Sequence, residues 1–111
     1  LRVLVADATQ LPVAGASFDA IVTPWFLDAT ALEARRLVTS LLECLRPGGV
    51  WVNHGPLLYG ATTTNAARLT AEELREVVDD AGLDVLSWGT GDEVHLASPA
   101  GGSARRERVL T

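Results

Sequence analysis

The chain has 111 residues, which is enough for one small domain and too few for two. Its net charge of −5 argues against a nucleic-acid groove, because neutralising phosphates requires a basic stripe. The one basic cluster, Arg105, Arg106 and Arg108, is more typical of a solvated turn than of a phosphate site. No run of apolar residues approaches the length of a membrane span, so we expect neither a nucleic-acid partner nor a membrane one.

The cysteine and methionine content indicates the compartment of the protein and whether the chain is part of a longer one. Cys44 is the single cysteine, which excludes an internal disulfide and favours a reducing, cytoplasmic compartment. The sequence contains no methionine, although gene products normally begin with one. We therefore expect the chain to begin inside a longer protein.

The first third of the chain predicts two strands. Residues 2–6 are apolar and rich in β-branched side chains, and the run ends at Asp7, as is typical of a buried strand. Residues 9–17 contain a proline and a glycine and predict a loop. Residues 18–23 predict a second strand, which Pro24 stops.

A helix is predicted next from one apolar stripe at helical spacing. Thr30 and Glu33 stand at the spacing of a capping box for its start, and the Pro47-Gly48-Gly49 sequence ends it. The stripe consists of Ala34, Leu37, Val38, Leu41, Leu42 and Leu45.

A strand, a loop and a second helix follow. Residues 50–53 predict a strand, and the small polar residues 60–69 predict a loop. The second helix begins at Thr70 with a capping box to Glu73 and ends at Gly82.

The last part of the chain predicts two strands, residues 83–88 and 106–110, joined by a glycine-rich link over residues 89–104. No helical pattern separates them, so we expect an antiparallel pair. Strands that alternate with amphipathic helices predict a mainly parallel sheet. The sequence therefore predicts an α/β fold, with residues 1–111 as part of a single domain.

Two segments resemble a known superfamily. Residues 5–19 (VADATQLPVAGASFD) are similar to the stretch between the third and fourth strands of class I S-adenosylmethionine-dependent methyltransferases, and residues 45–52 (LRPGGVWV) resemble the end of a helix and the fifth strand. The resemblance implies a Rossmann-like, mostly parallel sheet with an antiparallel C-terminal strand pair. It also implies S-adenosyl-L-methionine as cofactor.

The glycine-rich loop of that superfamily is absent, so the resemblance implies a partial fold that lacks the first two strands. Those strands lie between the third and the fourth in the superfamily's sheet order. Freed sheet edges expose backbone donors and acceptors and invite self-association. We expect the missing part to come from preceding residues, from a second chain, or not at all, and we expect the segment alone to be inactive.

A narrower resemblance comes from residues 25–29 (WFLDA) and 51–59 (WVNHGPLLY), which are similar to the carnosine N-methyltransferase family. This chain departs from the family at Gly60, where relatives have a histidine. The resemblance implies N-methylation of a small molecule or short peptide that contains histidine, or of a related amine.

Cofactor-binding residues follow from the resemblance. The resemblance implies that the Asp7 carboxylate accepts a hydrogen bond from the adenine amino group, and that the backbone N–H of Ala8 or Thr9 donates one to a ring nitrogen. It also implies that Thr23 belongs to the same site. The alternative for Asp7 is a turn aspartate that caps the following loop, and the resemblance favours the cofactor role.

Asp28 is the first candidate for the acceptor site. It follows the second predicted strand beside Trp25 and Phe26, whose rings can order a substrate ring, and its carboxylate can hold an imidazole or amine N–H. An N-cap for the helix near Thr30 is the alternative. For Trp25, packing in the core is the alternative to contact with a substrate.

His54 and Tyr59 flank a Gly-Pro bend and complete the predicted catalytic set with Asp28. The imidazole of His54 can accept a proton near neutral pH, and an ordinary loop histidine is the alternative. Asn53 can donate to a substrate carboxylate or carbonyl. No spacing of histidine and cysteine indicates a metal site.

Two other functions remain open from the sequence. One is a methyltransferase for other small molecules, such as a phenol or quinone. The other is a non-catalytic interaction module that keeps the fold.

Overall fold

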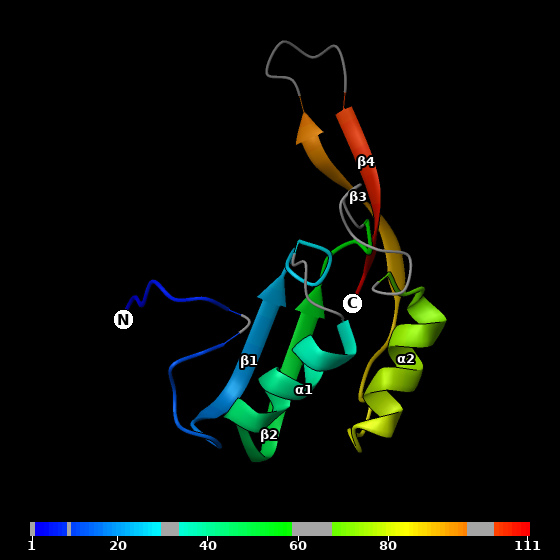
Figure 1. Cartoon of the computed structure of the whole chain (residues 1–111). Helices are drawn as coiled ribbons and strands as arrows, with labels where there is room; N and C mark the ends of the chain where they lie inside the picture. The colour runs from blue at the N-terminus through cyan, green and yellow to red at the C-terminus, as the bar shows by residue number, and fades with distance from the viewer. Residues whose placement is uncertain (1, 9, 30–33, 59–67, 98–103) are drawn as a thin grey trace.

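The computed structural model describes residues 2–8, 10–29, 34–58, 68–97 and 104–111. Its elements, in chain order, are β1 (Phe18–Pro24), α1 (Ala34–Cys44), β2 (Leu45–His54), α2 (Ala71–Asp80), β3 (Thr90–Ala97) and β4 (Ala104–Leu110) (Figure 1). β1 pairs with β2 in parallel, and β3 pairs with β4 in antiparallel orientation. The α/β class with a parallel pair and an antiparallel pair is thus confirmed, although the strands form two small sheets.

The register of β1 and β2 brings their carboxyl ends together. Ile21 pairs with Trp51, and Pro24, the last residue of β1, pairs with His54, the last of β2. α1 connects the two strands and lies over one face of their sheet (Figure 1). In this strand–helix–strand arrangement both strands end on the same side of the sheet, at Pro24 and His54. We call this side the carboxyl edge, and it is where open α/β sheets bind ligands.

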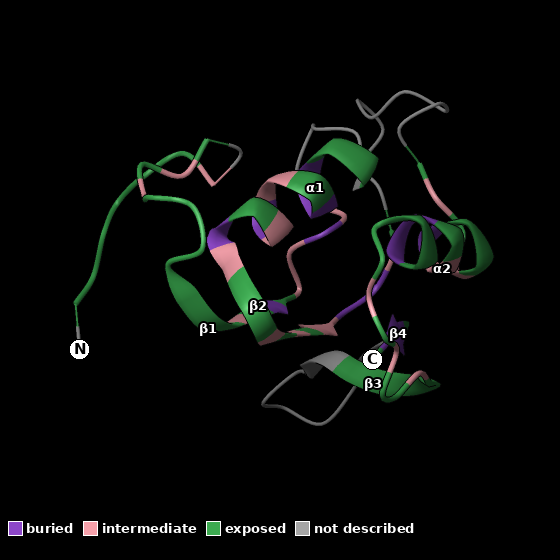
Figure 2. Ribbon diagram, turned by 90° about the horizontal axis from the view of Figure 1, so that it is seen from below, coloured by how far each residue is buried: buried purple, intermediate pink, exposed green. Residues whose placement is uncertain are grey.

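The helices supply most of the core. The middle of the predicted stripe of α1 is confirmed, since Leu37, Val38 and Leu41 are buried. The predicted end of the helix is wrong, because α1 stops at Cys44, and both Leu45 and the Pro47-Gly48-Gly49 sequence lie in β2. Figure 2 shows the buried residues of α1 and α2 on the inner sides of both helices. Burial of such a stripe is the main source of stability for a short helix. The core cluster consists of Leu27, Leu37, Val38, Leu41, Leu74, Val77 and Leu110.

The capping box of α2 is confirmed. The Thr70 hydroxyl accepts the N–H of Glu73 at 3.2 Å, and the Glu73 carboxylate accepts the N–H of Thr70 at 2.7 Å. Two of the backbone donors left free at a helix start are satisfied in this way. The capping box predicted for α1, at Thr30 and Glu33, lies outside the described residues.

The strand predicted over residues 2–6 does not form. Val3, Leu4 and Val5 are 83%, 64% and 97% exposed, and their segment runs away from the sheet without regular structure (Figure 1). A strand needs a neighbour to satisfy its backbone groups, and in the described part of the chain β1 pairs with β2 alone. The prediction was wrong because β-propensity alone does not supply the neighbouring strand that would satisfy the backbone groups of residues 2–6.

The C-terminal pair forms from different residues than predicted. Residues 83–88 have no strand structure, and β3 lies within the predicted link. β4 begins at Ala104, and β2 begins at Leu45, earlier than the predicted 50–53. Strand pairing is decided by which segments meet, so the more polar segment that opposes β4 becomes the strand. None of the helices in the described part is long and apolar enough to cross a membrane.

Candidate functional site at the carboxyl ends of β1 and β2

The backbone turns sharply where β1 ends. Trp25 follows Pro24 with φ at +50°, the left-handed conformation that a bulky L-residue rarely adopts. Its N–H donates to the carbonyl oxygen of His54 at 2.7 Å, and this bond holds the turn against the end of β2. Strained backbone of this kind is found mainly where the surrounding structure enforces it, and it is frequent at functional sites.

Gly55 lets the turn after β1 pack directly against the end of β2, and it also pairs with a third segment. A Cβ atom at position 55 would lie 2.8 Å from the Cα and 2.9 Å from the N of Trp25, so a side chain does not fit. The N–H of Gly55 donates to Leu110 O at 3.1 Å, and the N–H of Leu110 donates to Gly55 O at 2.8 Å. The pair joins the end of β4 to the end of β2, so three segments distant in sequence meet at one point.

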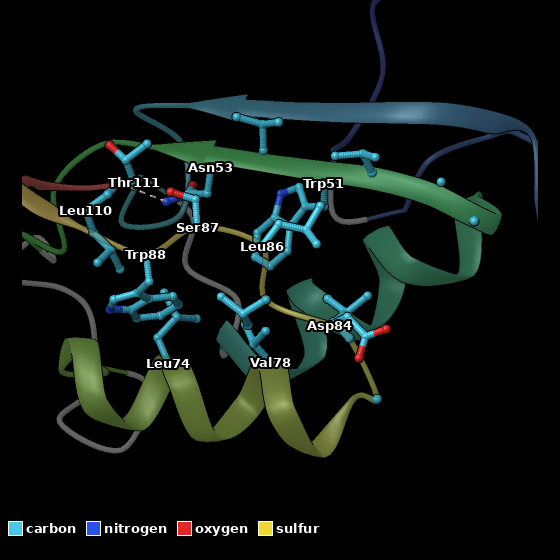
Figure 3. A pocket seen from close by; sticks show the side chains of 17 residues that line it. Trp51, Asn53, Leu74, Val78, Asp84, Leu86, Ser87, Trp88, Leu110 and Thr111 are labelled. Carbon is cyan, nitrogen blue, oxygen red and sulfur yellow. Dashed lines mark hydrogen bonds between the residues drawn. The ribbon is translucent and has the colours of Figure 1, made fainter.

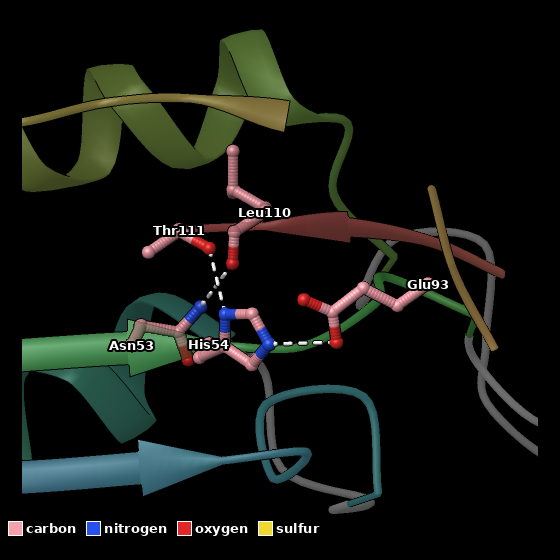
Figure 4. Close-up of polar contacts among 5 residues, drawn as sticks. All are labelled: Asn53, His54, Glu93, Leu110 and Thr111. Atoms are coloured by element: carbon pink, nitrogen blue, oxygen red, sulfur yellow. Dashed lines mark hydrogen bonds and ion pairs between the residues drawn. The ribbon is translucent and has the colours of Figure 1, made fainter. Parts of the chain in front are cut away.

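A buried polar network lies directly beneath this edge. The indole N–H of Trp51 donates to the Thr23 hydroxyl at 2.9 Å, and that hydroxyl donates to the Asn53 side-chain oxygen at 3.0 Å. The Asn53 amide donates to Leu110 O at 3.5 Å (Figure 4). Thr23 is 5% exposed. These contacts engage Thr23 and Asn53 within the protein, and their predicted contacts with cofactor and substrate stay predictions.

His54 lies between two partners from the other sheet. Its Nδ1 is 2.7 Å from the Thr111 hydroxyl, and its Nε2 is 3.1 Å from a carboxylate oxygen of Glu93 (Figure 4). The His54 side chain is 33% exposed and that of Glu93 47%. Glu93 was missed by sequence reasoning, because it lies in a segment read as a glycine-rich link with no motif around it.

Asp28 ties the segment after β1 to the segment after β2. Its Oδ2 accepts the N–H of Leu58 at 2.9 Å, and the residue is half-buried. Trp25 and Phe26 are also half-buried, whereas Leu27 is fully buried in the core. The carboxylate therefore has a fixed position at the carboxyl edge. The residues on which an N-cap role depends, and Tyr59, lie outside the described part of the chain.

Of the residues predicted to hold the cofactor, Thr23 lies in the network just described, whereas Asp7 and Ala8 lie elsewhere. Asp7 is exposed, its carbonyl oxygen accepts the N–H of Gln10 at 3.1 Å, and Thr9 lies outside the described residues. Ala8 lines a hollow of about 280 Å³ together with Ser40 and Cys44 of α1. The last turn of α1 leads into the amino end of β2, whereas His54 lies at the carboxyl end of β2 and Asp28 lies beyond that of β1.

This hollow fits only a part of S-adenosylmethionine. Apolar walls at Leu11 and Val13 suit an adenine ring, but the Asp7 side chain does not line the hollow. The described residues do not bring this hollow and Asp28 into one cavity, so they do not form a complete cofactor pocket. Nor do they place three or more His, Cys, Asp or Glu side chains where they could hold a metal ion.

A larger hollow of about 510 Å³ lies between β2, α2 and residues 82–88 (Figure 3). Its walls are largely apolar and include Trp51 from β2, Val78 from α2, and Leu86 and Trp88. The guanidinium of Arg75 stacks on Trp88 at 5.3 Å, which fixes one wall. Trp51 packs against the core cluster and also lines this hollow.

Comparison with known proteins gives a consistent family. Residues 2–93 match the family model for carnosine N-methyltransferase. The chain is 34% identical over 92 residues to a carnosine N-methyltransferase of Schizosaccharomyces pombe, which covers 72% of this chain and 24% of that protein. It is 41% identical over 63 residues to the one of Dictyostelium discoideum, covering 56% and 13%. The chain thus spans about a quarter or less of these relatives.

A solved structure also resembles this chain. It is the crystal structure of the [4+2]-cyclase SpnF, with a TM-score of 0.60 and 28% identity, covering 77% of this chain and 33% of that one. SpnF is named as a cyclase, so the shared fold does not by itself identify a reaction.

Proposed function

Because the chain belongs to the carnosine N-methyltransferase family, we propose that it supplies the acceptor side of an S-adenosylmethionine-dependent N-methyltransferase site. The family match includes every described residue at the carboxyl edge except those of β4 and Thr111. The acceptor that we propose is a small peptide containing histidine, such as carnosine. Residues outside these 111 complete the cofactor pocket in this proposal.

The observation that carries the proposal is the position of Asp28. One carboxylate oxygen accepts the Leu58 N–H, and a carboxylate has room for further donors at its remaining lone pairs. The half-buried rings of Trp25 and Phe26 lie in the same turn. A carboxylate in this setting can hold one N–H of an imidazole and so fix the direction of the opposite nitrogen, which is the alignment that methyl transfer needs.

The test is a pair of substitutions at Asp28 in the longest native polypeptide that contains this chain. Asp28→Asn keeps an oxygen for the Leu58 N–H but turns a donor toward the substrate, whereas Asp28→Ala removes both contacts. We expect each to lower the turnover of carnosine by about 100-fold or more, since a misplaced acceptor loses the benefit of alignment. Calorimetric titration with S-adenosylhomocysteine should give unchanged affinity.

The matched control is Asp80→Asn, which removes an exposed ion pair with Arg35 at 3.0 Å and should leave turnover unchanged. Full turnover of carnosine by Asp28→Ala would show that Asp28 does not hold the acceptor. The absence of both carnosine turnover and S-adenosylhomocysteine binding in the unsubstituted protein would leave the interaction module as the better interpretation.

A second candidate is supported by the larger hollow. A cavity of about 510 Å³ with walls of Trp51, Leu86 and Trp88 suits a flat aromatic acceptor such as a phenol or quinone. A turnover screen of imidazole peptides against phenols separates the two. Under the first proposal the peptides are methylated and the phenols are not.

A further inference from the structure

The contact between His54 and Glu93 joins the site to the second sheet. Both ring nitrogens of His54 have a partner: Nε2 lies 3.1 Å from Glu93 Oε2, and Nδ1 lies 2.7 Å from Thr111 Oγ1. His54 is the last residue of β2, and Glu93 lies in β3. Figure 4 shows the imidazole between these two side chains at the carboxyl edge.

The two partners differ in what they can do chemically. An ionised carboxylate only accepts hydrogen bonds, so the Nε2 that faces Glu93 must carry the proton. A hydroxyl can donate or accept, and Thr111 therefore donates to Nδ1 when the ring is neutral. The tautomer of a histidine is set in this way by the hydrogen bond that its other nitrogen makes.

We propose that Glu93 is a positioning residue that holds the neutral His54 imidazole with Nε2–H toward its carboxylate, so that Nδ1 is a hydrogen-bond acceptor for a substrate N–H. Thr111 is exposed, and a substrate N–H takes the place of its hydroxyl at Nδ1. The substrate part of this inference rests on the proposed function.

The charges at this edge favour the same kind of substrate. Asp28 and Glu93 each present a carboxylate, and His54 presents a lone pair, so the described groups mainly accept hydrogen bonds. Such an edge selects imidazole and ammonium N–H groups over carboxylates. Asp92, the neighbour of Glu93, is instead engaged by Arg108 at 3.4 Å, and Glu107 is the register partner of Glu93 in β4.

The first measurement is made without any turnover. We expect ¹⁵N NMR of the histidine rings, in the longest native polypeptide and at a pH where the imidazole is neutral, to show a protonated and exchange-protected Nε2 and an unprotonated Nδ1 for His54. His54→Gln identifies the signals by their loss. Glu93→Ala should abolish the protection, Glu93→Gln should retain part of it because its amide oxygen still accepts, and Asp92→Asn should leave it unchanged.

The second measurement is calorimetric titration with carnosine. Glu93→Ala should weaken carnosine binding by about 5- to 10-fold, the effect of losing the orientation of one hydrogen bond. Asp92→Asn, the matched control on the same strand, should bind within about twofold of the unsubstituted protein. The Glu93 side chain is 47% exposed, so its removal leaves the fold intact.

Each outcome separates this inference from the proposed function. A neutral His54 with an unprotonated Nε2, or NMR signals that Glu93→Ala does not change, overturns the role of Glu93. Tight carnosine binding by both the unsubstituted protein and Glu93→Ala overturns the inference and leaves the proposed function standing. If the unsubstituted protein binds no carnosine, the proposed function and the substrate part fail together, and the NMR result alone decides whether Glu93 sets the tautomer.

Discussion

Replacing Gly55 by alanine tests the geometry of the whole carboxyl edge. The new Cβ would lie 2.8 Å from the Cα and 2.9 Å from the N of Trp25, and both are backbone atoms that cannot rotate away. The backbone must therefore shift. Three hydrogen bonds meet here: Trp25 N–H to His54 O at 2.7 Å, and the reciprocal pair between Gly55 and Leu110 at 3.1 and 2.8 Å.

The magnitude follows from these bonds. A net contribution of about 0.5–1.5 kcal/mol for each gives a loss of about 2–4 kcal/mol in the free energy of unfolding. In a domain of about 150–250 residues this lowers the melting temperature by about 5–15 °C. Circular dichroism of the longest native polypeptide measures both quantities by heat and by urea.

Two other glycines provide graded controls. Gly82 has φ at +77° with nothing within 4 Å of an added Cβ atom, so alanine there costs only the left-handed conformation, about 1–2 kcal/mol. Gly89 has open space and no such φ, and alanine should change stability by less than about 0.5 kcal/mol. A loss at position 55 no greater than at position 82 would refute the steric argument.

Two further substitutions test the helices. Thr70→Ala removes the hydroxyl that accepts the Glu73 N–H and should cost about 1 kcal/mol, read as a shift of the urea midpoint with an unchanged slope. Leu37→Ala empties a fully buried position of α1 and should cost about 2–5 kcal/mol, whereas Leu86→Ala, at a residue 85% exposed, should cost less than about 0.5 kcal/mol. Equal effects at the two leucines would contradict the burial of α1.

Local signals in the sequence were sufficient for the helices. The apolar stripe of α1 and the capping box at Thr70 depend on residues within one or two turns. The capping box appears as predicted, and so does the stripe up to Leu41, although its last predicted member, Leu45, lies in β2. β1, close to its predicted bounds, is equally local, because Pro24 limits it. The family resemblance was also readable, since it rests on short contiguous motifs, and the match over residues 2–93 confirms it.

Unlike the helices, the pairing of the strands could not be predicted from local sequence. Residues 2–6 and 83–88 have the composition of strands but form none, whereas Thr90–Ala97, read as a link, becomes β3. A strand exists only when a second segment satisfies its backbone groups, and that segment can lie anywhere in the chain.

The same distinction between local sequence and tertiary contacts applies to the residues of the site. The sequence alone placed Asp28 after one predicted strand and His54 at the end of another. The parallel pairing of β1 with β2, seen in the structure, then put the ends of both strands on the same side. Only the tertiary structure decided that Glu93 faces His54, that the end of β4 pairs with Gly55, and that Ala8 lies away from Asp28. These contacts join residues far apart in sequence, and no local pattern of residue types encodes which of them meet.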